Sequence, residues 1–210
     1  AAVQSAEFFI DDFESYPSGS LIAQSSPNWA TYSGNAGGGQ DDALVSNTQM
    51  ASGNNSIYLN QLNDDDIYLP FDQVYNSGNI EIIMDVFVGS TAHMNVQGTT
   101  SPGALELFEL RFNNSSMMEF DIGTTTLLGS YPGPGNWFKL KINGDLNSSI
   151  WTIYINGAYQ GGATVADGNE VASMNFKPEI GDEFYLDNVE WYAISDDDCL
   201  GPTSPVVVNV

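Results

Sequence analysis

Carboxylate side chains occupy alternate positions in several apolar runs of the chain, and paired carboxylates can cleave glycosidic bonds. Such catalysis needs one protonated and one ionised carboxyl group beside the scissile bond. The candidates that could converge on one sheet face are Glu81, Asp85, Glu109, Glu119 and Asp121. Glu119-Phe120-Asp121 starts a Glu-x-Asp-x-x-Glu spacing, but Thr124 stands where the second Glu is needed. The favoured interpretation is a solvated or ion-paired strand face.

Other catalytic sets are incomplete in this sequence. A polysaccharide lyase needs a base and a group that neutralises a uronate, and the only set available is His93, Gln97, Arg111 and Tyr131. The order of these residues does not follow that of alginate lyases. A Ser or Cys nucleophile would need His93, the single histidine, and no Gly-x-Ser-x-Gly element flanks a serine. We therefore predict no catalytic residues and keep a glycoside hydrolase or lyase as the alternative.

Aromatic and amide side chains suit a different task, which is the recognition of sugars. Aromatic rings stack on the C–H faces of sugars, and amides hydrogen-bond their hydroxyl groups. Trp137 and Trp151 are expected in the core, whereas Trp29 and Tyr32 lie in a polar, loop-like segment and are expected to be exposed. The predicted ligand-binding residues are Trp29, Tyr32, Phe87, Asn95, Gln97, Tyr131 and Tyr159.

The charge balance excludes several classes of ligand. The chain has 27 acidic and 4 basic residues, and its formal net charge is −23. Nucleic acids and anionic membranes need clustered Lys and Arg, so neither is an expected partner. The surplus of carboxylates favours solubility in salt water and the binding of calcium, a cation that prefers oxygen ligands.

Period-two alternation of apolar residues indicates strands throughout. In the clearest strands, every second residue is expected to face inward. These strands are Ile80–Val88, Phe108–Phe112, Met118–Ile122, Phe138–Ile142 and Trp151–Ile155, counted from the first residue of each. Asn156-Gly157 predicts a tight hairpin with positive φ at both residues. Asn143-Gly144 and Ser77-Gly78 are predicted to end strands, and Gly37-Gly38-Gly39 and Tyr131–Gly135 to form longer loops.

These patterns predict one all-β domain, an antiparallel jelly-roll sandwich over residues 1–195 without substantial helix. Residues 196–210 start with an acidic run and continue with Gly, Pro and Ser, which is typical of a linker to a further domain of a longer chain. Cys199 is the only cysteine, so its thiol is free or its partner lies elsewhere. No apolar run is long enough to span a bilayer, and the composition resembles that of extracellular proteins.

Several motifs, in their order along the chain, resemble one family. Trp151–Gly157 resembles a hairpin of laminin-G-like and concanavalin-A-like domains. Asp12–Tyr16, Trp29, Asp41-Asp42-Ala43, Tyr131–Phe138 and Tyr185–Glu190 look like the jelly-roll module of large bacterial surface proteins secreted by the type IX pathway. Similar motifs occur in β-sandwich carbohydrate-binding modules. The resemblance covers roughly Phe9–Tyr192 and implies a companion module of a secreted or cell-surface protein.

The resemblance also implies a calcium site, because the first and last strands of such modules often lie side by side and share the ion. It places Glu14 and Asp187 as ligands, with Asp12 and Asn188 as further candidates. The alternative is that these side chains are solvated or hydrogen-bonded to backbone. Asp64–Asp66 and Asp196–Asp198 lack the spacing that wraps an ion, so we expect solvated loops there.

The sequence thus predicts a non-catalytic glycan-recognition or adhesion module, secreted or on the cell surface. Its expected partners are a polysaccharide or glycoconjugate and the other domains of its own chain, with calcium as the possible cofactor. A polysaccharide-degrading enzyme and a structural spacer of an adhesin are the alternatives.

Overall fold

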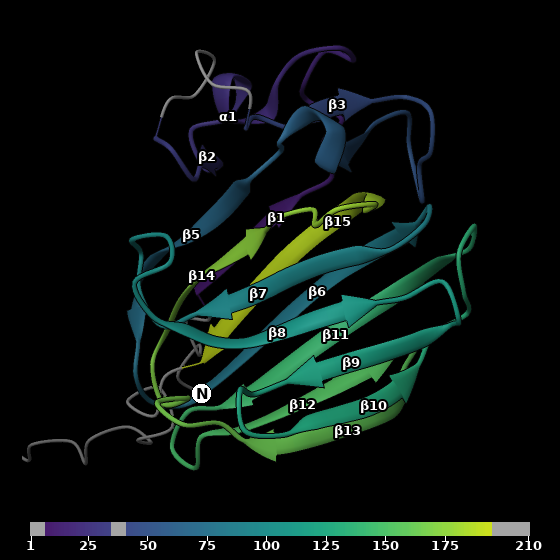
Figure 1. Cartoon of the computed structure of the whole chain (residues 1–210). Helices are drawn as coiled ribbons and strands as arrows, with labels where there is room; N and C mark the ends of the chain where they lie inside the picture. Colours follow the sequence, from purple (N-terminus) through teal and green to yellow (C-terminus); the bar gives the residue numbers. More distant parts are fainter. Residues whose placement is uncertain (1–6, 35–40, 195–210) are drawn as a thin grey trace, which may run out of the picture.

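The computed structural model describes residues 7–34 and 41–194, and these residues form two stacked antiparallel sheets (Figure 1). The helical elements among them are short: α1 (Ile22–Ser25) and the 3-10 turn η1 (Gln61–Asn63). The predicted antiparallel β-sandwich is therefore confirmed. In the described residues, no helix has the length and apolar character needed to cross a membrane. Gly37–Gly39, Cys199 and the segment 196–210 lie outside the described residues.

One sheet, here called the outer sheet, has eight strands. In spatial order they are β13 (Ala158–Thr164), β12 (Ile150–Ile155), β11 (Trp137–Asp145), β6 (Asn79–Val88), β15 (Glu183–Ile194), β4 (Ser56–Asn60) and β3 (Leu44–Ser46). The eighth strand, β1 (Glu7–Asp11), also pairs with β15. The first and last described strands therefore lie side by side, as the sequence resemblance implied.

The other sheet, here called the groove sheet, has seven strands. Their spatial order is β10 (Thr126–Ser130), β9 (Met117–Asp121), β8 (Glu106–Phe112), β7 (Ala92–Gln97), β14 (Val171–Phe176), β5 (Ile67–Tyr75) and β2 (Ala30–Thr31). Strands β7 and β14 lie at its centre and come from distant parts of the sequence.

The core lies between the two sheets and follows the period-two patterns, because alternate side chains of a strand face opposite ways. On β6, Ile80, Ile82, Met84, Val86 and Val88 are all buried. The expected core position of Trp151 is confirmed, since its side chain is fully buried. The same expectation is wrong for Trp137, which is only half-buried because it faces away from the core and packs on Phe87 with ring centroids 5.5 Å apart.

The turns agree with the sequence in three places, one of them the predicted loop Tyr131–Gly135 between β10 and β11, and differ in one. Asn156 and Gly157 have φ of 50° and 79° and join β12 to β13, which confirms the hairpin. Gly78 lies in the turn between β5 and β6. The predicted strand end at Asn143-Gly144 is wrong, because both residues continue β11. Gly144 pairs with Trp151, and the indole ring occupies the space that a Cβ would need.

Candidate binding groove

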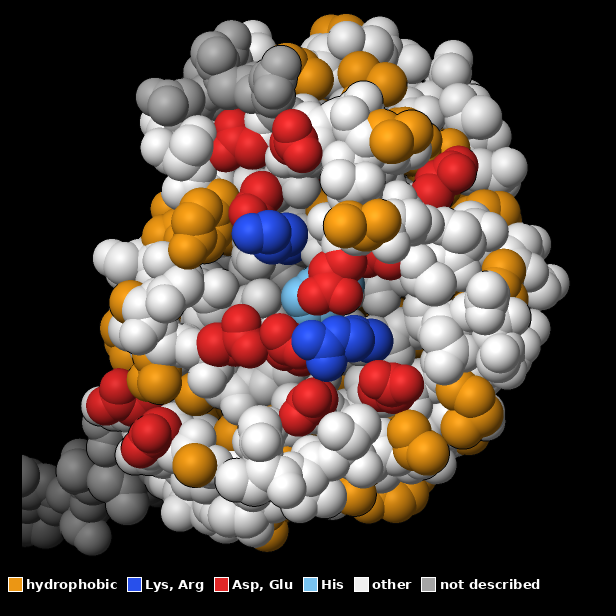
Figure 2. All heavy atoms as spheres, viewed as in Figure 1, with side chains coloured by type: hydrophobic (Ala, Val, Ile, Leu, Met, Phe, Trp, Pro, Cys, Tyr) orange, Lys and Arg blue, Asp and Glu red, His pale blue; other side chains and the backbone are white. Residues whose placement is uncertain are grey.

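A groove of about 860 Å³ lies on the solvent side of the groove sheet. Strand β7 forms its floor, with Ala92, Met94 and Val96 buried in the core and the alternate residues His93, Asn95 and Gln97 lining the groove. Asn175 of β14 lies directly opposite Asn95. Loops carrying Tyr32, Asp64–Asp66 and Lys177–Ile180 form the walls. Figure 2 shows acidic side chains gathered around the basic ones and the histidine on this face.

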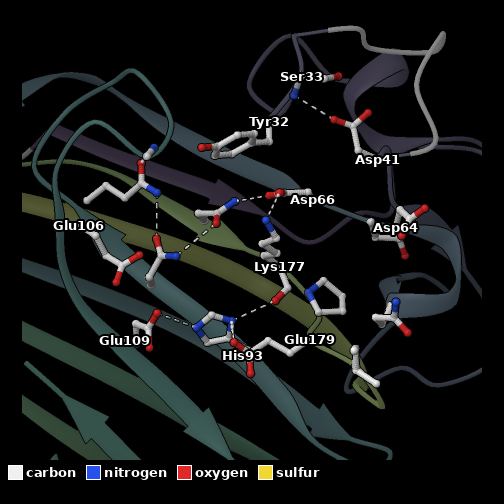
Figure 3. Close-up of a pocket in the computed structure, with 18 residues that line it drawn as sticks. Tyr32, Ser33, Asp41, Asp64, Asp66, His93, Glu106, Glu109, Lys177 and Glu179 are labelled. Atoms are coloured by element: carbon white, nitrogen blue, oxygen red, sulfur yellow. Dashed lines mark hydrogen bonds and ion pairs between the residues drawn. The ribbon is translucent and has the colours of Figure 1, made fainter. Parts of the chain in front are cut away.

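A row of hydrogen-bonded amides crosses the floor (Figure 3). Gln97 Nε2 donates to Asn95 Oδ1 at 2.9 Å, and Asn95 Nδ2 donates to Asn175 Oδ1 at 3.2 Å. Asn175 Nδ2 then donates to Asp66 Oδ1 at 2.8 Å. At the other end, the backbone N–H of Gly103 donates to Gln97 Oε1 at 3.1 Å. The row fixes the orientation of each amide, because every group in it has a defined donor or acceptor role.

One end of the groove combines an aromatic ring with an ion pair. Tyr32 is 45% exposed and forms part of the wall. The Lys177 ammonium lies 5.5 Å from the centre of the Tyr32 ring and 3.3 Å from Asp66 Oδ2. This end therefore holds an ammonium group between a carboxylate and a ring face, an arrangement that stabilises a cation.

The other end is built around His93 and Arg111, which lie directly opposite each other on β7 and β8. The His93 ring is buried, with Nδ1 3.2 Å from the carbonyl oxygen of Lys177 and Nε2 3.4 Å from Glu109 Oε1. Arg111 forms an ion pair with Glu109 and lies 3.4 Å from Asp121 Oδ2 and 3.9 Å from Glu179 Oε2. Each cationic group at this end thus faces carboxylates.

Burial shifts the proton affinity of several groove carboxyl groups. It raises the pKa of Asp65 to about 7, with a further contribution from the nearby Asp42. Burial also raises the pKa of Asp66, although Asn175 and Lys177 oppose this. The pKa of Glu106 is raised by burial and by the adjacent Glu109. These shifts follow from placing negative charge in a partly desolvated, acidic groove.

The structure brings together three of the predicted ligand-binding residues, namely Tyr32, Asn95 and Gln97. The predicted exposure of Trp29 is wrong. Its ring is buried between Phe13 and Phe176, with centroids 5.8 Å from each, and its Nε1 donates to Asp11 at 3.0 Å. The polar sequence around Trp29 gave no sign that the core closes over it.

The other three predicted aromatic residues lie away from the groove. Tyr131 is buried against Phe112 and Phe138, so a ligand cannot use its ring and that prediction is wrong. Phe87 lies on the solvent side of the outer sheet. Tyr159 is 61% exposed on β13, where it contacts Tyr154.

The candidate carboxylates do not converge on one face. Glu109, Glu119 and Asp121 belong to the groove sheet, paired across β8 and β9. Glu81 and Asp85 project from the outer sheet, 3.1 Å and 3.0 Å from Lys141 and Lys139. Of the possible lyase set, His93, Gln97 and Arg111 share the groove face of β7 and β8. Tyr131 does not.

The expectation of a solvated loop at Asp64–Asp66 is wrong for two of its residues. Asp65 and Asp66 are buried, and only Asp64 is exposed. Asp65 accepts a hydrogen bond from the backbone N–H of Asn60 at 2.8 Å. Asp66 ends the amide row, so its burial is matched by hydrogen-bond donors.

The carboxylates proposed for calcium lie around the loop between β3 and β4. Glu14 accepts hydrogen bonds from the backbone N–H groups of Asn54 and Asn55 at 2.7 Å and 2.8 Å. Asp187 accepts from the N–H groups of Ala51 and Ser52 at 2.9 Å and 3.0 Å. Backbone hydrogen bonds are thus present at both carboxylates.

The two further calcium candidates also have hydrogen-bond partners. Asp12 accepts from the N–H of Glu14 at 3.2 Å, and Asn188 Nδ2 donates to Asp85 at 2.9 Å. Among the described residues, no cluster of three or more His, Cys, Asp or Glu side chains is arranged to hold a metal. Calcium remains a sequence-based prediction.

Several groove residues were not singled out as site residues from the sequence, chiefly Glu106, Asn175, Lys177 and Glu179. A signal was present for two of them. Ser173 and Asn175 alternate with Met174 and Phe176, so they mark a polar face on a buried strand. Lys177 is one of only four basic residues in the chain. The position of the others depends on which strands and loops become neighbours.

Comparison with known proteins confirms the fold alone. The sequence matches no protein-family model and no curated protein. Among solved structures, a sialidase has a TM-score of 0.60 at 11% identity over 86% of this chain. The globular domain of T. cruzi calreticulin has a TM-score of 0.56 at 6% identity, covering 90% of this chain and 89% of that one. The binding domain of botulinum neurotoxin serotype G has a TM-score of 0.50 at 12% identity, over 80% of this chain and 47% of that one. The chain spans only 19% of the sialidase.

Proposed function

We propose that this protein is a non-catalytic glycan-recognition or adhesion module, secreted or displayed on a cell surface, and that its groove binds a glycan chain. The observation that carries the proposal is the amide row Gln97–Asn95–Asn175 on the groove floor, below the exposed ring of Tyr32. Ligand sites typically combine a concave surface with a few oriented polar groups, and this groove has both.

The amide row suits hydroxyl groups because it is oriented before any ligand arrives. Each side-chain amide has two N–H donors. Among the described residues, Asn95 and Gln97 each use one of them within the row. Asn95 and Gln97 are 5% and 1% exposed, so only a small part of the row is open to a ligand on the groove floor. A rigid strand holds that part, so little conformational entropy is lost on binding. Tyr32 adds an exposed ring on which a sugar can stack.

A carbohydrate ligand also agrees with the name of one protein of the same fold, the sialidase. That similarity shows the fold alone, so the proposal depends on the groove. Its test is a glycan array together with depletion of the protein by insoluble polysaccharides, run with and without calcium. We expect Asn95→Ala and Tyr32→Ala each to reduce the affinity for the glycan about tenfold. This corresponds to the loss of roughly one hydrogen bond to the ligand or of one stacking contact.

The matched control is Tyr159→Ala, which removes an exposed tyrosine outside the groove. It is expected to leave binding unchanged. Equal losses for Tyr32→Ala and Tyr159→Ala would contradict the assignment of the groove. The absence of any glycan bound by the folded protein would instead favour a structural spacer.

A second candidate, a polysaccharide-degrading enzyme, is favoured by one observation. His93, Glu109 and Arg111 meet at one end of the groove. We expect no cleavage, because every cationic group there faces a carboxylate and none is available to neutralise a substrate carboxylate. Release of reducing ends or unsaturated sugars by the pure protein, lost in Glu109→Gln, would overturn the non-catalytic proposal.

A further inference from the structure

A bulge in strand β8 brings two glutamates to the same face of the groove sheet. The pairing of β7 with β8 shifts between Val96 and Gln97, so that Val96 lies opposite Phe108 while Gln97 lies opposite Glu106. The shift leaves Leu107 as the extra residue. Glu106 and Glu109 are three positions apart and would otherwise point to opposite sides of a strand. Both instead line the groove.

The groove holds more carboxylates than cations. Its lining includes seven of them, Asp41, Asp64, Asp65, Asp66, Glu106, Glu109 and Glu179. Lys177 is the lysine among the lining residues and already faces Asp66 and Tyr32. Arg111 next to the groove faces Glu109, Asp121 and Glu179. A uronate or sulfate entering the groove would meet repulsion, because each described cation there already faces a carboxylate.

A buried histidine lies at the same place with one nitrogen lacking a hydrogen bond. His93 is 5% exposed, and its Nε2 has no hydrogen-bond partner among the described residues. If Nδ1 donates its proton to the carbonyl oxygen of Lys177, 3.2 Å away, Nε2 of the neutral ring is an acceptor. Glu109 Oε1 lies 3.4 Å from it and is also an acceptor when ionised. In this tautomer, the contact between His93 Nε2 and Glu109 Oε1 has no donor of its own, and Arg111 pairs with the other carboxylate oxygen of Glu109.

We propose that Glu106, Glu109 and His93 form a subsite for a protonated amino group, so that the glycan selected by the groove carries free amino groups, as a polymer of glucosamine does. The proposal rests on the proposed function. An ammonium group has three N–H donors and no acceptor, and the subsite offers the Glu106 carboxylate, Oε1 of Glu109, whose Oε2 pairs with Arg111, and one ring nitrogen. The groove already holds one ammonium in this way, because Lys177 lies between Asp66 and Tyr32.

Proton linkage supports the same assignment. The charged groups that act on Glu106 are Glu109 and Arg111 on β8 and Asp121 on β9. His93, Lys177 and Glu179 line the same groove. Burial and Glu109 raise the pKa of Glu106, which therefore retains its proton more readily than an ordinary glutamate. A bound ammonium would take the place of that proton. At a pH where the free amine is already protonated, binding is thus expected to release protons and to weaken as the pH falls.

The test compares short oligosaccharides by titration calorimetry. The probes are glucosamine trimers, their N-acetylated counterparts and oligoglucuronates. We expect the glucosamine trimer to bind at least about tenfold more tightly than the N-acetylated trimer. A difference of this size is typical of one charge-assisted hydrogen bond. Titrations in buffers of different ionisation enthalpy, at a pH where the free amine is already protonated, are expected to show proton release.

Any polycation is attracted to a chain of net charge −23. Two variants that each remove one negative charge, one inside the subsite and one outside it, therefore separate specific binding from this general attraction. Glu106→Gln is expected to remove the preference for the free amine while keeping the binding of the N-acetylated trimer. Glu81→Gln, on the outer sheet, is the control and is expected to keep the preference.

The outcomes separate the two proposals. Binding of the N-acetylated trimer with no preference for the amine, or equal effects of Glu106→Gln and Glu81→Gln, would overturn the amino-group subsite alone. Tighter binding of the oligoglucuronate would also overturn it. Failure of any glycan to bind, with the protein still folded, would refute the proposed function as well.

Discussion

Gly144 lies under the ring of Trp151, and its replacement by alanine is expected to destabilise the protein. A Cβ at position 144 would come within 2.8 Å of two carbons of the indole ring and 2.9 Å of a third. Such distances are far below van der Waals contact, so the ring or the strand must move.

The ring has little freedom to move. Trp151 is fully buried, and its Nε1 donates to the carbonyl oxygen of Gly168 at 2.9 Å. The ring of Phe108 packs edge-on against it with centroids 5.1 Å apart. Overpacking of a core typically costs about 1–3 kcal/mol. Because the indole is held on several sides, we expect Gly144→Ala to lower the free energy of unfolding by about 2–3 kcal/mol.

This loss is measurable by thermal and chemical denaturation. For a chain of this length, it corresponds to a decrease in Tm of about 4–12 °C. The matched control is Gly161→Ala on β13, where a Cβ would lie 3.9 Å from Leu127, an ordinary contact. Alanine is favoured over glycine inside a strand, so this control is expected to be neutral or stabilising by up to about 1 kcal/mol. Equal stabilities of the two variants would refute the packing of Trp151 over Gly144.

Three further predictions concern the hairpin, the buried acid and the chain ends. Gly157→Val is expected to destabilise the fold by about 1–3 kcal/mol because φ is 79° at this position, and unchanged denaturation would contradict the hairpin. The pKa of Asp65 is raised to about 7 from an unfolded value near 4, so its stabilising effect is complete below pH 4 and is lost as the pH rises towards 7. Asp65→Asn is therefore expected to reduce the loss of Tm between pH 4 and pH 7.5, and an unaltered profile would show that Asp65 does not titrate there. If calcium joins Glu14 and Asp187, a chelator lowers Tm and Glu14→Ala removes that response; a Tm indifferent to chelator speaks against the ion.

The sequence by itself determined the local features of this protein. The alternation along β6, β8, β11 and β12 could be predicted because a strand with one buried face repeats every second residue. The Asn156-Gly157 hairpin could be predicted because its positive φ angles depend on those two residues alone. The charge count likewise needs no structure.

The tertiary structure decided which of these residues share a site. Asn95 and Asn175 meet across 80 positions of sequence, because β14 inserts between β7 and β5. The bulge at Leu107 turns Glu106 into the groove, and no local pattern indicates it. The Asn143-Gly144 pair was interpreted as a turn from its local sequence. The structure shows instead that position 144 needs a glycine because the ring of Trp151, on the neighbouring strand, fills the space of a Cβ. Strand pairing and sheet stacking depend on residues far apart in the sequence. They determine the position of the groove, which charged residues line it, and the burial of Trp29.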